Sequence, residues 1–267
     1  MLDTSEFKIS LGQDFKIDDL DPNTTRGNKA KAKTETRKLI GKLDELQENL
    51  YAEHKHKVLI VLQAMDTGGK DGVIRRIFEG VNPAGVRVAH FREPSEEEKD
   101  RGFLWRYSEQ VPRIGEIVIF NRSQYEGVLV ERVHKIVSEE VYEKRYDEIN
   151  EFETLLAQEG TSIVKFYLHI DSEEQKKRIL ERIRDPTKEW KFSSDDLSER
   201  RLWPEYMKAY EEVLTKTSTA EAPWYAVPAN HRWFRDYLVA TVVVELLESL
   251  KLRYPKLGRD LKSIKIE

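Results

Sequence analysis

Residues 57–72 read KVLIVLQAMDTGGKDG, and this stretch decides the fold. It begins with a β-branched and leucine-rich run at 58–62, which is typical of a parallel strand buried on both faces. A glycine-rich segment with one lysine follows at once, and residues 71–79 then have a helical pattern. Strand, glycine-rich loop and helix in this order indicate a phosphate-binding loop, or P-loop.

The loop departs from the P-loop pattern GxxxxGK[ST] at two positions. Gly69 and Lys70 match the pattern, whereas Ala64 replaces the first glycine and Asp71 replaces the Ser or Thr. An ordinary glycine-rich turn capped by Asp71 is the alternative. In a P-loop, backbone N–H groups and the following helix N-terminus surround phosphate oxygens. We therefore expect phosphate binding by Gly68, Gly69, Lys70, Asp71 and Gly72.

The loop carries two carboxylates, Asp66 and Asp71, beside the expected phosphates. A carboxylate is repelled by phosphate unless a cation lies between them. Mg²⁺ is commonly held by one or two carboxylates together with phosphate oxygens. Asp66 is therefore the candidate ligand for Mg²⁺, or for Mn²⁺ in its place. Alternatively, Asp66 orients an attacking phosphate.

A second polar cluster follows the apolar strand expected at 116–120. In many P-loop enzymes such a strand ends in an aspartate that holds Mg²⁺, but here it ends in Asn121. Asn offers only a neutral carbonyl oxygen to a metal. Arg122 comes next, at the sheet edge where open α/β folds bind ligands. A polar turn that caps the next helix is the alternative for 121–123.

The pattern along the chain predicts an α/β fold with a parallel sheet and helices on both faces. Strands are expected at 57–62, 87–91, 116–120, 162–170 and 224–227. Helices are expected at 29–50, 71–79, 96–110, 139–158, 172–184, 195–214 and 232–252, with Pro204 bending or restarting the sixth. We expect one domain at 29–255, preceded by an extended arm at 1–28, and a polar tail at 256–267. The highly charged stretch at about 172–216 is expected to form a helical lid.

Composition limits the choice of function. The 267 residues include 45 Lys and Arg against 49 Asp and Glu, a net charge of −4, so a general nucleic-acid binder is not indicated. The chain has no cysteine, which excludes thiol nucleophiles and Cys-ligated zinc. Neither a signal peptide nor an apolar run long enough for a membrane span is evident, so we expect a cytoplasmic protein with no membrane partner.

The chain resembles the polyphosphate kinase 2 family. The resemblance is carried by 63–72 (QAMDTGGKDG), 80–86 (GVNPAGV), 103–106 (FLWR) and 120–126 (FNRSQYE), and downstream by 190–193 (WKFS), 201–203 (RLW) and 222–229 (APWYAVPA). It implies a thymidylate-kinase-like P-loop kinase with a three-layer α/β/α fold, a central five-stranded parallel sheet and a helical lid. Asn121 resembles the class that acts on both AMP and ADP, although that class commonly has Asp where this chain has Gly127.

The resemblance implies Mg²⁺-dependent, reversible transfer of the terminal phosphoryl group of inorganic polyphosphate to nucleoside mono- and diphosphates. AMP, ADP and guanine nucleotides are the expected acceptors, and a homo-oligomer (dimer or tetramer) is expected. An ATP-dependent nucleotide or small-molecule kinase of the same fold, and a non-catalytic nucleotide- or polyphosphate-binding module, are the alternatives. The expected catalytic residues are Asp66, Lys70 and Arg122.

Further binding residues are expected on both sides of the loop. Arg178 and Arg182 lie four residues apart on one helix face and could close over phosphates. A solvated helix face is the alternative for these two and for Arg75. Arg75, Arg178 and Arg182 are thus candidates for phosphate binding, and Phe91, Trp105, Asn121, Arg122 and Glu126 are candidates for nucleotide binding.

Overall fold

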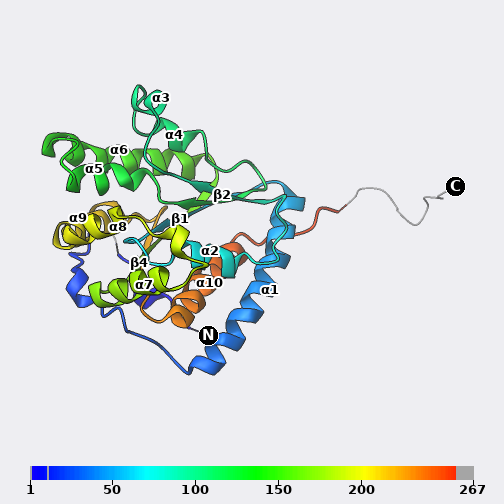
Figure 1. Cartoon of the computed structure of the whole chain (residues 1–267). Coiled ribbons are helices and arrows are strands. Elements are labelled where there is room, and N and C mark those ends of the chain that lie inside the picture. The colour runs from blue at the N-terminus through cyan, green and yellow to red at the C-terminus, as the bar shows by residue number, and fades with distance from the viewer. Residues whose placement is uncertain (1, 11, 257–267) are drawn as a thin grey trace, which may run out of the picture.

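The protein is built on a five-stranded parallel sheet with strand order β2-β3-β1-β4-β5, as the computed structural model shows for residues 2–10 and 12–256 (Figure 1). Every strand lies where the sequence predicts it, and no strand end is displaced by more than one residue. The strands are β1 (Lys57–Gln63), β2 (Val86–His90), β3 (Ile117–Asn121), β4 (Thr161–His169) and β5 (Trp224–Pro228).

Helices cover both faces of the sheet, so the predicted three-layer α/β/α fold is confirmed. One face packs against α1 (Lys29–Glu53), α2 (Lys70–Ile77) and α10 (Arg232–Ser249). The other face packs against α6 (Glu139–Gln158) and α9 (Trp203–Thr217).

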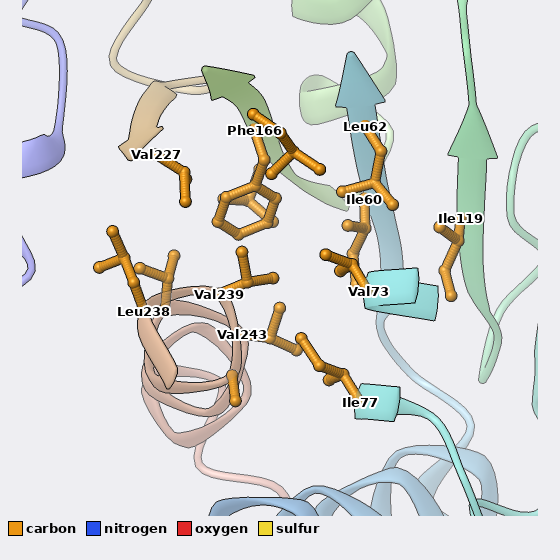
Figure 2. Packing of buried hydrophobic residues seen from close by; sticks show 14 of the residues in the cluster. Ile60, Leu62, Val73, Ile77, Ile119, Phe166, Val227, Leu238, Val239 and Val243 are labelled. Carbon is orange, nitrogen blue, oxygen red and sulfur yellow. The ribbon is translucent and has the colours of Figure 1, made fainter. Parts of the chain in front are cut away.

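The central strand β1 supplies both apolar layers because its side chains alternate between the faces. Ile60 and Leu62 join the cluster with α2 and α10, which Figure 2 shows from close by. Leu59 and Val61 join the cluster with α6 and α9. Each fully buried aliphatic side chain of this kind stabilises the fold by about 1.5–3 kcal/mol. Burial on both faces explains why 58–62 has no polar residue.

The remaining elements are short or lie at the sheet edges. They are α3 (Glu96–Lys99), α4 (Trp105–Ser108), α5 (Val130–Val133), α7 (Ser172–Arg184), α8 (Asp195–Arg201) and the 3₁₀ turns η1 (Ser5–Phe7), η2 (Ile17–Asp19), η3 (Gln124–Gly127) and η4 (Glu189–Lys191). The single helix predicted at 96–110 is wrong, because a capping box of Ser95 and Glu98 starts a first turn that ends before Gly102. The helices predicted at 139–158 and 172–184 have the predicted ends.

The charged stretch at 172–216 does not form one lid-like unit. A new helix, α9, starts at Trp203 with Pro204 in its first turn, as the restart alternative predicted. Tyr206, Tyr210 and Leu214 of α9 are buried in the core, so α9 is a layer of the fold. Only α7, η4 and α8 remain as candidates for a lid over the site.

The N-terminal segment, for which the sequence predicts an extended arm, packs against the core. Phe7 and Ile9 are buried, and the backbone N–H of Ile9 donates to the Trp224 carbonyl oxygen of β5 at 2.9 Å. Most of the predicted tail, residues 257–267, lies outside the described residues. Within the residues that the structure describes, no helix combines the length and apolar character needed to cross a bilayer.

Candidate active site

The predicted P-loop lies between β1 and α2, at the edge where the parallel strands end. β3 ends beside it, because Leu62 of β1 is in register with Asn121 of β3. The edge also receives the end of β2, where His90 is in register with Asn121. Residues distant in the sequence therefore meet at the carboxyl ends of three neighbouring strands, which is where open α/β sheets place their ligands.

Glycines are required at two positions of the loop. Gly69 has a φ of 107°, which side-chain-bearing residues rarely adopt. A Cβ at Gly68 would lie 2.5 Å from the Ala64 Cβ and 2.8 Å from the Met65 carbonyl oxygen. The first-glycine position therefore still holds a small residue, Ala64, and a glycine faces it across the turn. Thr67 is held in the left-handed region at a φ of 64°, which adds strain of the kind found at ligand-binding loops.

Lys70 reaches back over the loop. Its Nζ donates to the Ala64 carbonyl oxygen at 2.8 Å. Burial lowers the pKa of Lys70, and the nearby Arg122 guanidinium acts in the same direction. The ammonium group thus lies over the loop, as expected of a P-loop lysine.

Asp66 and Arg122 face each other above the loop. Arg122 Nη2 donates to Asp66 Oδ1 at 3.0 Å, and Arg122 Nη1 lies 3.6 Å from Glu126 Oε2. Glu126 and then Asp66 raise the pKa of Arg122, against the effect of burial. Oδ2 of Asp66 accepts no hydrogen bond from the residues that the structure describes. The pair therefore keeps one carboxylate oxygen available to a cation.

Asn121 connects the loop helix to β2. Its Nδ2 donates to Asp71 Oδ1 at 2.8 Å and lies 3.1 Å from His90 Nδ1. Asp71, which replaces the Ser or Thr of the P-loop pattern, is therefore hydrogen-bonded to Asn121, which replaces the aspartate at the end of the neighbouring strand.

Two buried arginines support the loop from the other side. Arg178 of α7, only 5% exposed, donates through Nη1 to the carbonyl oxygens of Thr67 and Gly68 at 3.1 and 3.2 Å. Arg235 of α10 is bound to Asp236 through Nε and Nη2 at 2.9 and 2.6 Å. The guanidinium of Arg235 lies against Gly69, because a Cβ there would be 3.2 Å from its Cζ. Both cations are fixed beside the expected phosphates.

Two cavities meet at Asp66 and Arg122. The first, of about 530 Å³, lies over the loop, and eleven of its 22 lining residues are Lys or Arg against four acidic residues. The second, of about 810 Å³, has a mixed lining that includes Phe103, Tyr107 and Tyr210. We call them the basic cavity and the aromatic cavity. The arrangement suits two ligands, one polyanionic and one with an aromatic ring system, that meet at a shared centre.

Comparison with known proteins gives one family. The model of the polyphosphate kinase 2 (PPK2) family matches residues 26–256. The chain belongs to the polyphosphate kinase 2 family.

Two curated members are similar over most of their length. The AMP/ADP-polyphosphate phosphotransferase of Meiothermus ruber is 51% identical over 98% of this chain and 99% of its own. The ADP-polyphosphate phosphotransferase of Rhodopseudomonas palustris is 46% identical over 81% of this chain and 79% of its own. The crystal structure of polyphosphate kinase 2 from Arthrobacter aurescens TC1 superposes with a TM-score of 0.92 at 42% identity, covering 96% of this chain and 93% of that one.

In this PPK2 chain, most of the predicted site residues lie together. The basic cavity is lined by Asp66, Gly68, Gly69, Lys70, Asp71, Gly72, Arg75, Phe91, Asn121, Arg122, Arg178 and Arg182. Glu126 lines the aromatic cavity, and Asp66 and Arg122 line both.

Four predicted residues have surroundings that differ from the expectation. Trp105 lies outside the lining of both cavities, where the Arg101 guanidinium stacks 4.2 Å from its ring. Phe91 and Asn121, both predicted to bind the nucleotide, border the basic cavity rather than the aromatic one. The ring of Phe91 packs against Tyr107 with centroids 4.5 Å apart. Arg178 is fixed to loop carbonyls, so it is a built-in part of the site rather than a residue of an exposed lid face.

Arg232 and Arg235 at the start of α10 also line the basic cavity, although they are not among the site residues predicted from the sequence. The available signal was a pair of arginines at the start of a helix with an apolar centre, just after the end of the last strand. A helix that starts at that end of β5 begins beside the P-loop. The buried Asp236, which fixes Arg235, gave no separate signal.

A protein-only metal centre is not present in the described part of the chain, since no group of three or more His, Cys, Asp or Glu side chains there could hold an ion. The residues do fit Mg²⁺ bound together with a substrate, because Asp66 has an available oxygen between two cavities suited to ligands. Asp66 would hold such an ion with phosphate oxygens. When bound, the ion would neutralise charge on the transferred group.

Proposed function

We propose that this chain transfers the terminal phosphoryl group of inorganic polyphosphate to AMP and ADP, in a reversible, Mg²⁺-dependent reaction. The observation that carries the proposal is the meeting of a basic and an aromatic cavity at Asp66 and Arg122. The name of the relative from Meiothermus ruber supports AMP and ADP as acceptors, and the name of the relative from Rhodopseudomonas palustris supports ADP.

The basic cavity is assigned to polyphosphate. Its excess of cations contrasts with the net charge of −4 of the whole chain, so positive charge is concentrated where a polyanion would bind. Phe91 is its only Phe, Tyr or Trp, and it is packed against Tyr107. This lining gives little surface for an adenine ring, which favours polyphosphate over ATP as the donor.

The aromatic cavity is assigned to the acceptor nucleotide. Tyr107 and Tyr210 offer apolar surface to a base, while Arg122 and Glu126 lie toward the shared centre. The proposal includes guanine nucleotides as further acceptors. A homo-oligomer and a cytoplasmic location remain expectations from the sequence.

The reaction requires positioning and charge compensation rather than a covalent intermediate. A phosphate oxygen of the acceptor forms a bond to the terminal phosphorus of polyphosphate, and the bond from that phosphorus to the bridging oxygen breaks. The bridging oxygen keeps the electron pair, so polyphosphate becomes one unit shorter. Lys70 and the loop amides would stabilise the charge on the donor side, and Arg122 would orient the acceptor phosphate.

The test is to incubate purified protein with Mg²⁺, polyphosphate and, separately, AMP, ADP, GMP and GDP, and to resolve the products by chromatography. ADP from AMP and ATP from ADP are expected. A parallel series with ATP in place of polyphosphate tests the alternative donor. Formation of product only in the ATP series, or in neither series, would refute the proposal.

A further inference from the structure

His90 is a residue of the basic cavity to which the reaction described above gives no role. It is the last residue of β2, its side chain is exposed, and it stands beside Asn121 in the sheet register. It therefore lies at the carboxyl edge of the sheet, in the same cavity as the P-loop.

The neighbours of His90 determine which ring nitrogen carries its proton. Asn121 Nδ2 donates to Asp71 Oδ1 at 2.8 Å, and this contact fixes the orientation of the amide because an ionised carboxylate only accepts. The same Nδ2 lies 3.1 Å from His90 Nδ1. An amide nitrogen cannot accept a hydrogen bond, so Nδ1 is the acceptor. The proton of the neutral ring is then on Nε2.

The Nε2–H group is available to a ligand. The hydrogen bonds of the described residues include none to His90 Nε2, and the ring lines the basic cavity. Because the two ring nitrogens point in different directions, Nε2 is directed away from the Asn121 contact made by Nδ1. A neutral N–H donor among cations suits a phosphate oxygen, which can accept several hydrogen bonds.

We propose that His90 Nε2–H donates a hydrogen bond to a phosphate oxygen of polyphosphate in the basic cavity, with Asn121 and Asp71 holding the ring in the required tautomer. This inference rests on the proposed function for the identity of the ligand. His90 belongs to the lining of the basic cavity and not to that of the aromatic cavity, which favours the donor over the nucleotide as its partner.

Two substitutions separate the roles of the ring nitrogens. In His90→Gln the side-chain amide reaches the position of Nε2 and can still donate there. In His90→Asn the amide reaches only the position of Nδ1, so contact with Asn121 is kept and the outward donor is lost. Loss of a hydrogen bond to a charged group predicts that the KM for polyphosphate rises about tenfold in His90→Asn and less than threefold in His90→Gln. The KM for ADP should be unchanged in both.

The control is His56→Asn, since His56 precedes β1 at the opposite end of the sheet. It should leave both KM values unchanged. Calorimetry of polyphosphate binding in the absence of nucleotide separates this inference from the proposed function. If wild-type protein shows no turnover, weaker binding in His90→Asn than in His90→Gln would still support the contact. Equal effects of the two variants, or a rise in the KM for ADP instead, would overturn it.

Discussion

Replacing Gly69 by alanine should both destabilise the protein and damage the P-loop, whereas the same change at Gly160 should only strain the end of α6. Both glycines have positive φ, 107° and 83°. A Cβ at Gly160 meets nothing within 4 Å, but a Cβ at Gly69 would overlap the guanidinium of Arg235. Gly160→Ala is therefore a matched control for backbone strain without a steric clash.

The structure gives the size of the difference. The left-handed conformation costs a residue with a side chain about 1–2 kcal/mol, and both variants bear this cost. Arg235 cannot move freely, because it is 3% exposed and donates twice to Asp236. Loss of a charge-assisted hydrogen bond adds about 1.5–3 kcal/mol, so the free energy of unfolding should fall by about 3 kcal/mol or more in Gly69→Ala.

Urea denaturation measures both variants by linear extrapolation, and the polyphosphate assay gives kcat/KM. Displacement of the loop amides in Gly69→Ala should lower kcat/KM about a hundredfold, a loss typical of misplacement by about 1 Å. Gly160→Ala should stay within twofold of wild type. Equal losses of stability in the two variants would refute the claim that Arg235 is fixed against the loop.

Three other changes test separate parts of the site and fold. Asp66→Asn should lower kcat/KM about a thousandfold with little change in the urea midpoint, and near-normal turnover would contradict the metal role. Burial lowers the pKa of His169 to about 4, so the ring is neutral in the folded protein. The free energy of unfolding should therefore be highest above the ordinary His pKa of about 6.5 and fall by about 3 kcal/mol as the pH drops toward 4. This loss should be smaller in His169→Asn, and an unchanged pH profile in that variant would contradict the prediction. Asn121→Asp should lower the free energy of unfolding by about 1 kcal/mol, a small value because Asp71 is exposed. Adding Asp71→Asn should restore the stability, and losses that simply add in the double variant would contradict a coupling between the two residues.

The sheet and the P-loop could be predicted because their signals are local. The run at 58–62 and the glycines after it determine a buried strand and a turn whatever the rest of the chain does. The prediction of one helix at 96–110 was wrong for an equally local reason. The capping box at Ser95 starts only a short helix at Glu96–Lys99, and the next helix begins after Gly102. Turn chemistry decided the outcome there.

What could not be predicted depends on contacts between distant residues. Ile9 is buried where its backbone N–H donates to the Trp224 carbonyl oxygen, and the sequence of the N-terminal segment does not indicate that partner. Arg178 and Arg182 share one helix, yet Arg178 reaches the loop carbonyls while Arg182 pairs with Asp196 at 3.2 Å. Helical spacing places side chains on a common face, but it does not tell which of them the rest of the fold buries.

Asp71 in the P-loop and Asn121 at the end of β3 both depart from what is usual in P-loop enzymes, and the two departures compensate for each other. In the usual pattern a hydroxyl at the start of the loop helix accompanies a carboxylate at the end of the neighbouring strand. Here the carboxylate is on α2 and the hydrogen-bond donor is at the end of β3, with 2.8 Å between them. An aspartate at position 121 would set two carboxylates against each other, so Asp71 favours an amide there. Considered singly, each departure weakens the case for a phosphate site, but together they keep one donor and one acceptor at this point. The exchange leaves Asp66, with its available Oδ2 and its place in the lining of both cavities, as the residue that we propose would hold a metal ion.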